Sequence, residues 1–142
     1  MKNKRLIYKL NTARHSLMKY LDGQSRELLD VSVAQMTTLM ILHEQDGCLM
    51  KDLAQRLMLD RSAVTGLAKR MEARGLITKS PCHEDTRATR LFMTKTGKAM
   101  LGDGVGLLQG VNQQMTEGFS DEEIETVSRF LKHVAHTFNQ EN

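Results

Sequence analysis

The sequence predicts a mainly α-helical fold with one small antiparallel β-hairpin, built by a single chain of 142 residues. Two observations predict it. Apolar residues recur at helical spacing in six segments, and residues 76–94 instead contain two strand-like runs around a polar connection. A chain of this length buries one good core. We therefore expect one subunit with about six helices, a central lobe at about 34–98, and flanking helices at about 1–33 and 99–142.

The first predicted helix has an apolar stripe and then a stop signal. Leu6, Leu10, Leu17 and Leu21 lie at helical spacing, and Asp22-Gly23 follows them. We expect this helix to end there, after about four turns.

Two capping boxes predict where later helices begin. Ser32 with Gln35, and Ser120 with Glu123, have the spacing at which each side chain caps a backbone N–H group of the other residue. The helix after Ser32 is expected to end near residues 46–47. Its predicted inward side chains are Met36, Leu39, Met40 and Leu42.

The last two helices have unusual patterns. Residues 95–115 are predicted to be helical although they contain four glycines, and each glycine costs about 1 kcal/mol relative to alanine. We expect a weak or bent segment, and either a hinge or close helix packing would explain it. The glycines are Gly102, Gly104, Gly106 and Gly110. The final helix has the seam of a coiled coil, formed by Ile124, Val127, Leu131, Val134 and Phe138.

The central lobe has helix-turn-helix spacing. Residues 50–57 and 61–74 are two short amphipathic segments separated by three residues. Asp60 is placed to cap the second segment, and Gly75 ends it. Strands at 76–80 and 89–94, joined by residues 81–88, then form a hairpin of the kind called a wing.

Positive charge is concentrated in this lobe. The chain has 20 basic and 17 acidic residues, but residues 51–98 hold eleven basic and five acidic ones. This distribution favours an anionic partner for the middle of the chain.

The outward face of residues 61–74 has the side chains that a major groove about 12 Å wide admits. Arg61 suits bidentate contact with guanine, Ser62 and Thr65 are short hydrogen-bonding groups, and Gly66 allows close backbone approach. An ordinary solvated helix face is the alternative interpretation. Lys69, Arg70 and Arg74 are the candidate phosphate contacts.

Six short segments share the pattern of a known family. They are residues 53–57, 60–64, 69–72, 74–77, 85–87 and 91–97. Together they resemble the MarR family of winged helix-turn-helix transcriptional regulators. Gly66 departs from the pattern, because relatives often have a larger polar side chain there.

The resemblance implies a homodimer joined through its terminal helices on a pseudo-palindromic DNA duplex. Recognition helices would enter successive major grooves and wings the adjacent minor grooves, where narrow width concentrates negative potential. Arg87 would be the wing-tip arginine, and Arg90 would be a second DNA-binding residue of the wing. Asp85 would support the wing by pairing with an arginine, and Arg90 is the nearest candidate in sequence.

The resemblance also implies a repressor that a small, often aromatic, ligand releases from DNA. Such a ligand would bind between the dimerisation helices and the DNA-binding lobe. Methionines suit adaptable pocket walls, although at helical spacing they are commonly core. The candidate cleft residues are Met18, Met36, Met40 and His43.

Other functions have little support in the sequence. A catalytic or metal site needs several converging side chains, but of the five histidines only His133 and His136 share a helix face. We therefore expect no catalytic site, metal site or cofactor.

Cys48 and Cys82 lack a flanking lysine or arginine and are expected to be structural, with oxidant sensing as an alternative function. A winged-helix protein-interaction module is the other alternative. No apolar run approaches the ~20 residues of a membrane span, and we expect a cytoplasmic protein.

Overall fold

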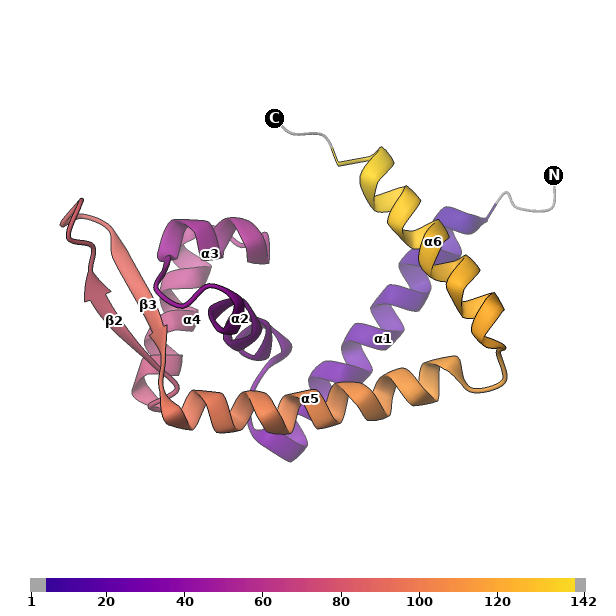
Figure 1. Ribbon diagram of the computed structural model, residues 1–142, viewed down its shortest axis with the longest axis horizontal. Helices are drawn as coiled ribbons and strands as arrows, with labels where there is room; N and C mark the ends of the chain where they lie inside the picture. Colours follow the sequence, from indigo (N-terminus) through magenta and orange to yellow (C-terminus); the bar gives the residue numbers. More distant parts are fainter. Residues whose placement is uncertain (1–4, 140–142) are drawn as a thin grey trace. The chain divides into compact units, whose positions relative to one another are not determined.

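A computed structural model describes residues 5–139, which form six helices and one three-stranded antiparallel sheet (Figure 1). The predicted fold class is confirmed. The flanking ranges 1–33 and 99–142 extend beyond the described residues at both ends. The chain divides into one unit up to Leu107 and a second from Leu108. The elements are α1 (Leu6–Leu29), α2 (Val33–Glu44), β1 (Cys48–Leu49), α3 (Met50–Leu57), α4 (Arg61–Ala73), β2 (Ile77–Pro81), β3 (Thr89–Met93), α5 (Lys95–Thr116) and α6 (Asp121–Thr137).

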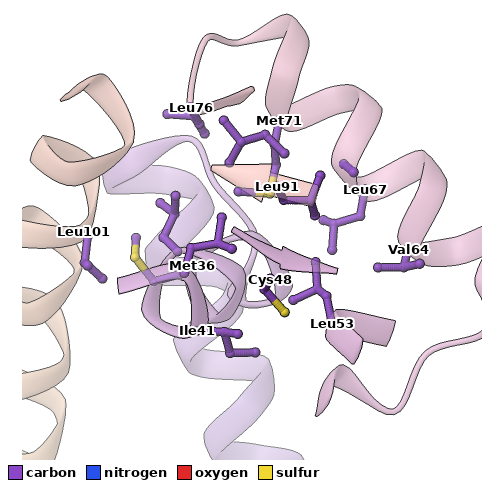
Figure 2. Close-up of a cluster of buried hydrophobic side chains, with 14 of the residues drawn as sticks. Met36, Ile41, Cys48, Leu53, Val64, Leu67, Met71, Leu76, Leu91 and Leu101 are labelled. Atoms are coloured by element: carbon purple, nitrogen blue, oxygen red, sulfur yellow. The ribbon is translucent and has the colours of Figure 1, made fainter. Parts of the chain in front are cut away.

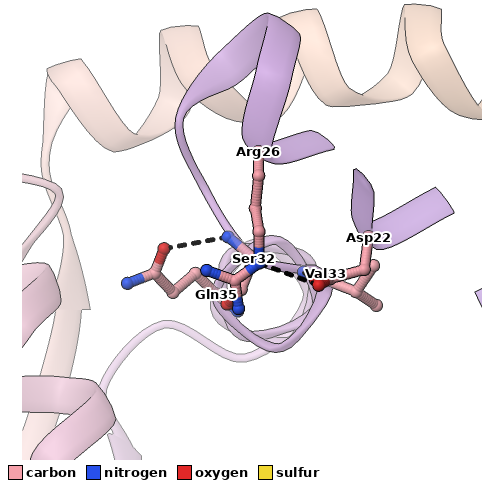
Figure 3. A network of polar contacts seen from close by, with 5 residues as sticks. All are labelled: Asp22, Arg26, Ser32, Val33 and Gln35. Carbon is pink, nitrogen blue, oxygen red and sulfur yellow. Dashed lines mark hydrogen bonds and ion pairs between the residues drawn. The ribbon is translucent and has the colours of Figure 1, made fainter. Parts of the chain in front are cut away.

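Helix α1 is longer than predicted, because it continues through Asp22-Gly23 to Leu29. The Asp22 carboxylate accepts hydrogen bonds from Arg26 Nε at 2.8 Å, one turn later, and from the Val33 backbone N–H at 2.9 Å (Figure 3). One glycine inside a helix costs only about 1 kcal/mol, which is too little to end it. The helix ends at Asp30, whose φ of 55° is left-handed.

Both predicted capping boxes are confirmed. The Gln35 N–H donates to Ser32 Oγ, and the Ser32 N–H donates to Gln35 Oε1, each at 3.1 Å (Figure 3). Ser120 and Glu123 make the same reciprocal pair at the start of α6. These local contacts fix where α2 and α6 begin.

The core of the first unit gathers side chains from α2, α3, α4, the sheet and the start of α5. Figure 2 shows Met36 and Leu101 at one end of this cluster and Leu53 and Val64 at the other. Met40 does not belong to it, because 39% of the residue is exposed, so its predicted inward position is wrong. Helix α2 is buried around most of its circumference, and Met40 lies with Glu44 on the stripe that remains outside.

The sheet has the order β1-β3-β2, with β3 in the centre. Leu91, in the middle of β3, pairs with Cys48 of β1 and with Lys79 of β2. Strand β1 is absent from the sequence prediction, because two residues are too short to show alternation.

Helix α5 is one uninterrupted helix through its glycines, so the helix predicted at residues 95–115 is confirmed. A Cβ at Gly104 would lie 2.3 Å from Met36 Sδ, which identifies close packing as the reason for glycine there. Thr94 Oγ1 accepts from the Gly97 N–H at 3.0 Å and so caps the first turn.

The second unit contains α6, none of whose residues is buried within the chain. Val127, Leu131 and Phe138 of the predicted seam are exposed by 49%, 44% and 74%. Across residues 5–139, no helix is both long and apolar enough to cross a membrane.

Candidate DNA-binding surface

Helices α3 and α4 form the helix-turn-helix that the sequence predicts. Met58 ends α3 with a φ of 55°, and Asp60 Oδ1 accepts from the Ala63 N–H at 2.7 Å, which confirms the predicted cap of α4. Val64, Leu67 and Met71 bury the inner face of α4. Its outer face is therefore left to polar side chains, of which Arg61, Ser62, Thr65 and Lys69 are exposed.

The wing is a β2–β3 hairpin with an ordered turn. The Arg87 N–H donates to Asp85 Oδ1 at 3.0 Å, and the Ala88 N–H donates to the Asp85 carbonyl at 2.9 Å. Arg87 Nε also lies 3.3 Å from Asp85 Oδ1, while 91% of its side chain remains exposed. The expected pair between Asp85 and Arg90 is wrong, because Arg90 Nη1 donates instead to the Gly47 carbonyl at 2.8 Å.

A groove of about 820 Å³ lies between α4 and the wing. Four of its twelve lining residues are basic and one, Asp85, is acidic. The basic residues come from four different elements: Lys51 from α3, Arg61 from α4, Lys79 from β2 and Arg87 from the wing turn. Thr65 and Thr89 add hydroxyl groups. The fold thus converts charges that are scattered in the sequence into one cationic groove, which suits an extended anion.

Comparison with known proteins gives a consistent result. The family model of the MarR family matches residues 31–89. An HTH-type transcriptional regulator of Bacillus subtilis (strain 168), YybA, is 31% identical over 110 residues, which cover 75% of this chain and 71% of YybA.

The chain belongs to the MarR family.

Two further relatives agree with this membership. The organic hydroperoxide resistance transcriptional regulator of the same organism is 28% identical over 117 residues, covering 80% of this chain and 76% of that protein. The solved S. aureus MepR–DNA complex is similar with a TM-score of 0.80 at 25% identity, over 93% of this chain and 96% of MepR. MarR proteins are DNA-binding transcriptional regulators and are not enzymes.

Two of the residues predicted as DNA contacts, Arg74 and Arg90, have other partners in this MarR fold. Arg70 is exposed, and a Cβ added at Gly66 would be 3.2 Å from its Nη1. Arg74 donates to the Asp30 carbonyl and lies 3.6 Å from the Asp30 carboxylate, so it ties α4 to the turn after α1. Arg90 is bonded to Gly47, as described above.

Lys51 and Lys79 are groove residues that sequence reasoning missed. Lys51 is in the first turn of α3, and Lys79 is near the middle of β2, 3.6 Å from Glu72 Oε1. Both belong to the central basic excess. Lys51 and Lys79 meet Arg61 and Arg87 only because of how α3, α4 and the hairpin pack. The spacing of these residues along the chain does not indicate that packing.

The two thiols have different environments. Burial raises the pKa of Cys48. The pKa of Cys82 is lowered, first by the backbone N–H of Asp85, then by that of Glu84, and also by Arg90. No lysine or arginine flanks Cys82 in the sequence, but the sheet brings Arg90 to it. Cys82 is nevertheless 4% exposed, which restricts access of an oxidant.

The four candidate cleft residues have different environments in the structure. Met36 is 6% exposed and packs against Gly104 as a core residue. Met18, Met40 and His43 are exposed. Among residues 5–139, no group of three or more His, Cys, Asp or Glu side chains is placed to hold a metal ion.

Proposed function

We propose that this MarR protein regulates transcription by binding a pseudo-palindromic duplex as a homodimer. In each subunit, α4 enters the major groove with Arg61, Ser62, Thr65 and Lys69, and the wing places Arg87 in the adjacent minor groove. The observation that carries the proposal is the cationic groove between these two elements, with an arginine exposed by 91% at its outer end. A duplex with half-sites about 34–36 Å apart fits the two-fold symmetry of such a dimer.

The groove also has a place in this arrangement. One sugar–phosphate strand separates a major groove from the neighbouring minor groove, so a protein that enters both must accommodate that strand between the entering elements. Lys51, Lys79 and Arg61 line the surface where the strand would pass. We assign Lys51 and Lys79 to phosphates, because lysine binds phosphate as a point charge and reads no base.

Repression with release by a small ligand is the finer part of the proposal. It is supported by membership of the MarR family. Titrating the bound duplex with small aromatic acids and phenols tests it, and no change in affinity for any of them would oppose it.

Duplex binding is tested by fluorescence anisotropy with a sequence that the protein enriches from a random pool. The logarithm of the affinity should fall linearly with the logarithm of salt concentration, with a slope of about −0.9 for each phosphate contacted. Arg87→Ala should weaken binding about five- to a hundredfold, as expected for loss of one groove contact.

Lys98→Ala is the matched control, because it removes an exposed charge from α5 outside the groove. It should leave affinity near that of the wild type. A protein-interaction module would show no salt-dependent duplex binding, and Arg87→Ala would then behave like Lys98→Ala. That result would end the proposal.

A further inference from the structure

Arg90 occupies a different environment from the exposed wing arginine. It lies in β3, the central strand, and its backbone pairs with Leu49 on one side and Ser80 on the other. Its guanidinium is half-buried and donates to the Gly47 carbonyl at 2.8 Å. A charge-assisted hydrogen bond of this kind is about twice as strong as a neutral one. Arg90 is therefore committed to the protein, whereas Arg87 is open to solvent.

The acceptor belongs to a corner that holds β3 at several successive points. The Gly47 N–H donates to the Leu91 carbonyl at 2.9 Å, and a Cβ at Gly47 would be 3.1 Å from the Phe92 ring. Asp46 Oδ1 accepts from the Met93 N–H at 2.9 Å. The φ of Gly47 is +81°, so this corner requires glycine both for its backbone and for the approach of the ring.

Among these contacts, the one made by Arg90 is the nearest to the wing turn. Beyond it lie the pairing of Pro81 with Thr89 and the turn from Cys82 to Ala88, in which Cys82 is buried. The corner itself is fixed, because Cys48, which follows Gly47, is 1% exposed in the core. Arg90 thus stands where the hairpin leaves the body of the lobe, three residues from Arg87.

We propose that Arg90 is the positioning residue of the wing: by tying β3 to the Gly47 carbonyl, it fixes the direction of the hairpin and acts on DNA through Arg87, without contacting phosphate itself. A binding group is effective only when held within about 0.5 Å of its productive position, and a hairpin freed at its base loses that precision. This inference rests on the proposed DNA-binding function, and its first test does not require DNA.

The first test is hydrogen–deuterium exchange on the free protein, with the whole chain of 142 residues. Arg90→Met keeps an unbranched apolar stem of similar shape but removes the donor. Amides of residues 82–89 should exchange about tenfold faster or more in this variant, as expected when a charged hydrogen bond that limits local opening is lost. Arg87→Ala and Lys98→Met are the controls. In each of them, the amides of residues 82–84 and of residues 90–93 should exchange at the wild-type rate. Unaltered exchange in Arg90→Met would overturn the inference, whatever the protein binds.

The second test is a double-mutant cycle on the enriched duplex. Arg90→Met should weaken binding at least fivefold when Arg87 is present and less than twofold in the Arg87→Ala background, because its effect passes through Arg87. The salt slope in that background should not change on adding Arg90→Met. A direct phosphate contact would instead give equal losses in both backgrounds and a slope smaller by about 0.9.

Arg90→Lys keeps both tests decisive if Arg90→Met does not fold. Lysine retains the charge, and so a phosphate contact, but lacks the planar fork and is shorter. If Arg90 positions the wing, the amides of residues 82–89 should exchange faster in Arg90→Lys, and the duplex should bind more weakly. Wild-type amide exchange together with wild-type duplex affinity would overturn the inference.

Discussion

At the scale of single residues, Asp22 shows how a side chain in a predicted stop signal can instead join two helices. Its pKa is lowered, first by the Val33 N–H and then by Arg26, so the carboxylate is favoured in the folded state. Asp22→Ala should lower the free energy of unfolding by about 1 kcal/mol at neutral pH, since it removes a helix cap and a partly exposed ion pair. Urea unfolding of wild type and variant measures the difference.

The same pair predicts a pH dependence. A carboxyl group whose folded-state pKa is depressed contributes stability above its unfolded pKa, and the contribution is lost as the pH falls through the folded value. The difference in free energy of unfolding between wild type and Asp22→Ala should therefore be constant near neutral pH. It should shrink at pH values below the usual pKa range of carboxyl groups. Asp103→Ala, an exposed acid on α5, is the control and should show little difference at any pH. A difference that persists in acid would contradict the assignment.

At the scale of elements, the glycines of α5 divide into those that packing requires and those that it does not. A Cβ at Gly102 meets nothing within 4 Å, whereas one at Gly104 would collide with Met36. Gly102→Ala should stabilise the protein by about 0.5–1 kcal/mol through helix propensity. Gly104→Ala should destabilise it by about 1–3 kcal/mol through overpacking. Thermal unfolding measures the change in melting temperature of each variant. Equal changes in the two variants would show that the close approach of Gly104 to Met36 has no packing role.

The elements also show what local sequence reasoning reaches. The capping residues Ser32, Asp60 and Ser120 were predicted with their helices, because a cap and its partner lie three residues apart. The end of α1 was predicted wrongly, because one glycine is too weak a signal to end a helix that continues to Leu29. Strand β1 was missed because only its pairing with β3 makes it a strand.

At the scale of the whole molecule, the exposed apolar face of α6 is the strongest support for the proposed homodimer. Val127, Leu131 and Phe138 are exposed in the single chain, and apolar seams of this kind are stable when a partner helix covers them. Leu131→Asp should give a protein of monomer mass by light scattering, with helix content retained and duplex affinity strongly reduced, because two half-sites are no longer bound together.

Arg129→Gln lowers the charge by one unit, as Leu131→Asp does, but on the polar side of α6. It should preserve both the dimer mass and duplex binding. If Leu131→Asp remains dimeric, α6 does not join the subunits, and the dimer proposal fails as stated.

Sequence patterns alone predicted the class of fold, the helix starts, the helix-turn-helix and the wing. These depend on apolar periodicity and on contacts within three or four residues, which a sequence displays directly. The six motif segments also determined the family. Only the tertiary structure decided which cations face one groove. Lys51 and Lys79 line the same groove as Arg61 and Arg87. Arg74 instead pairs with Asp30, and Arg90 donates a hydrogen bond to Gly47. The physical reason is that a charge is placed by packing between distant segments, and the sequence records its identity but not its neighbours.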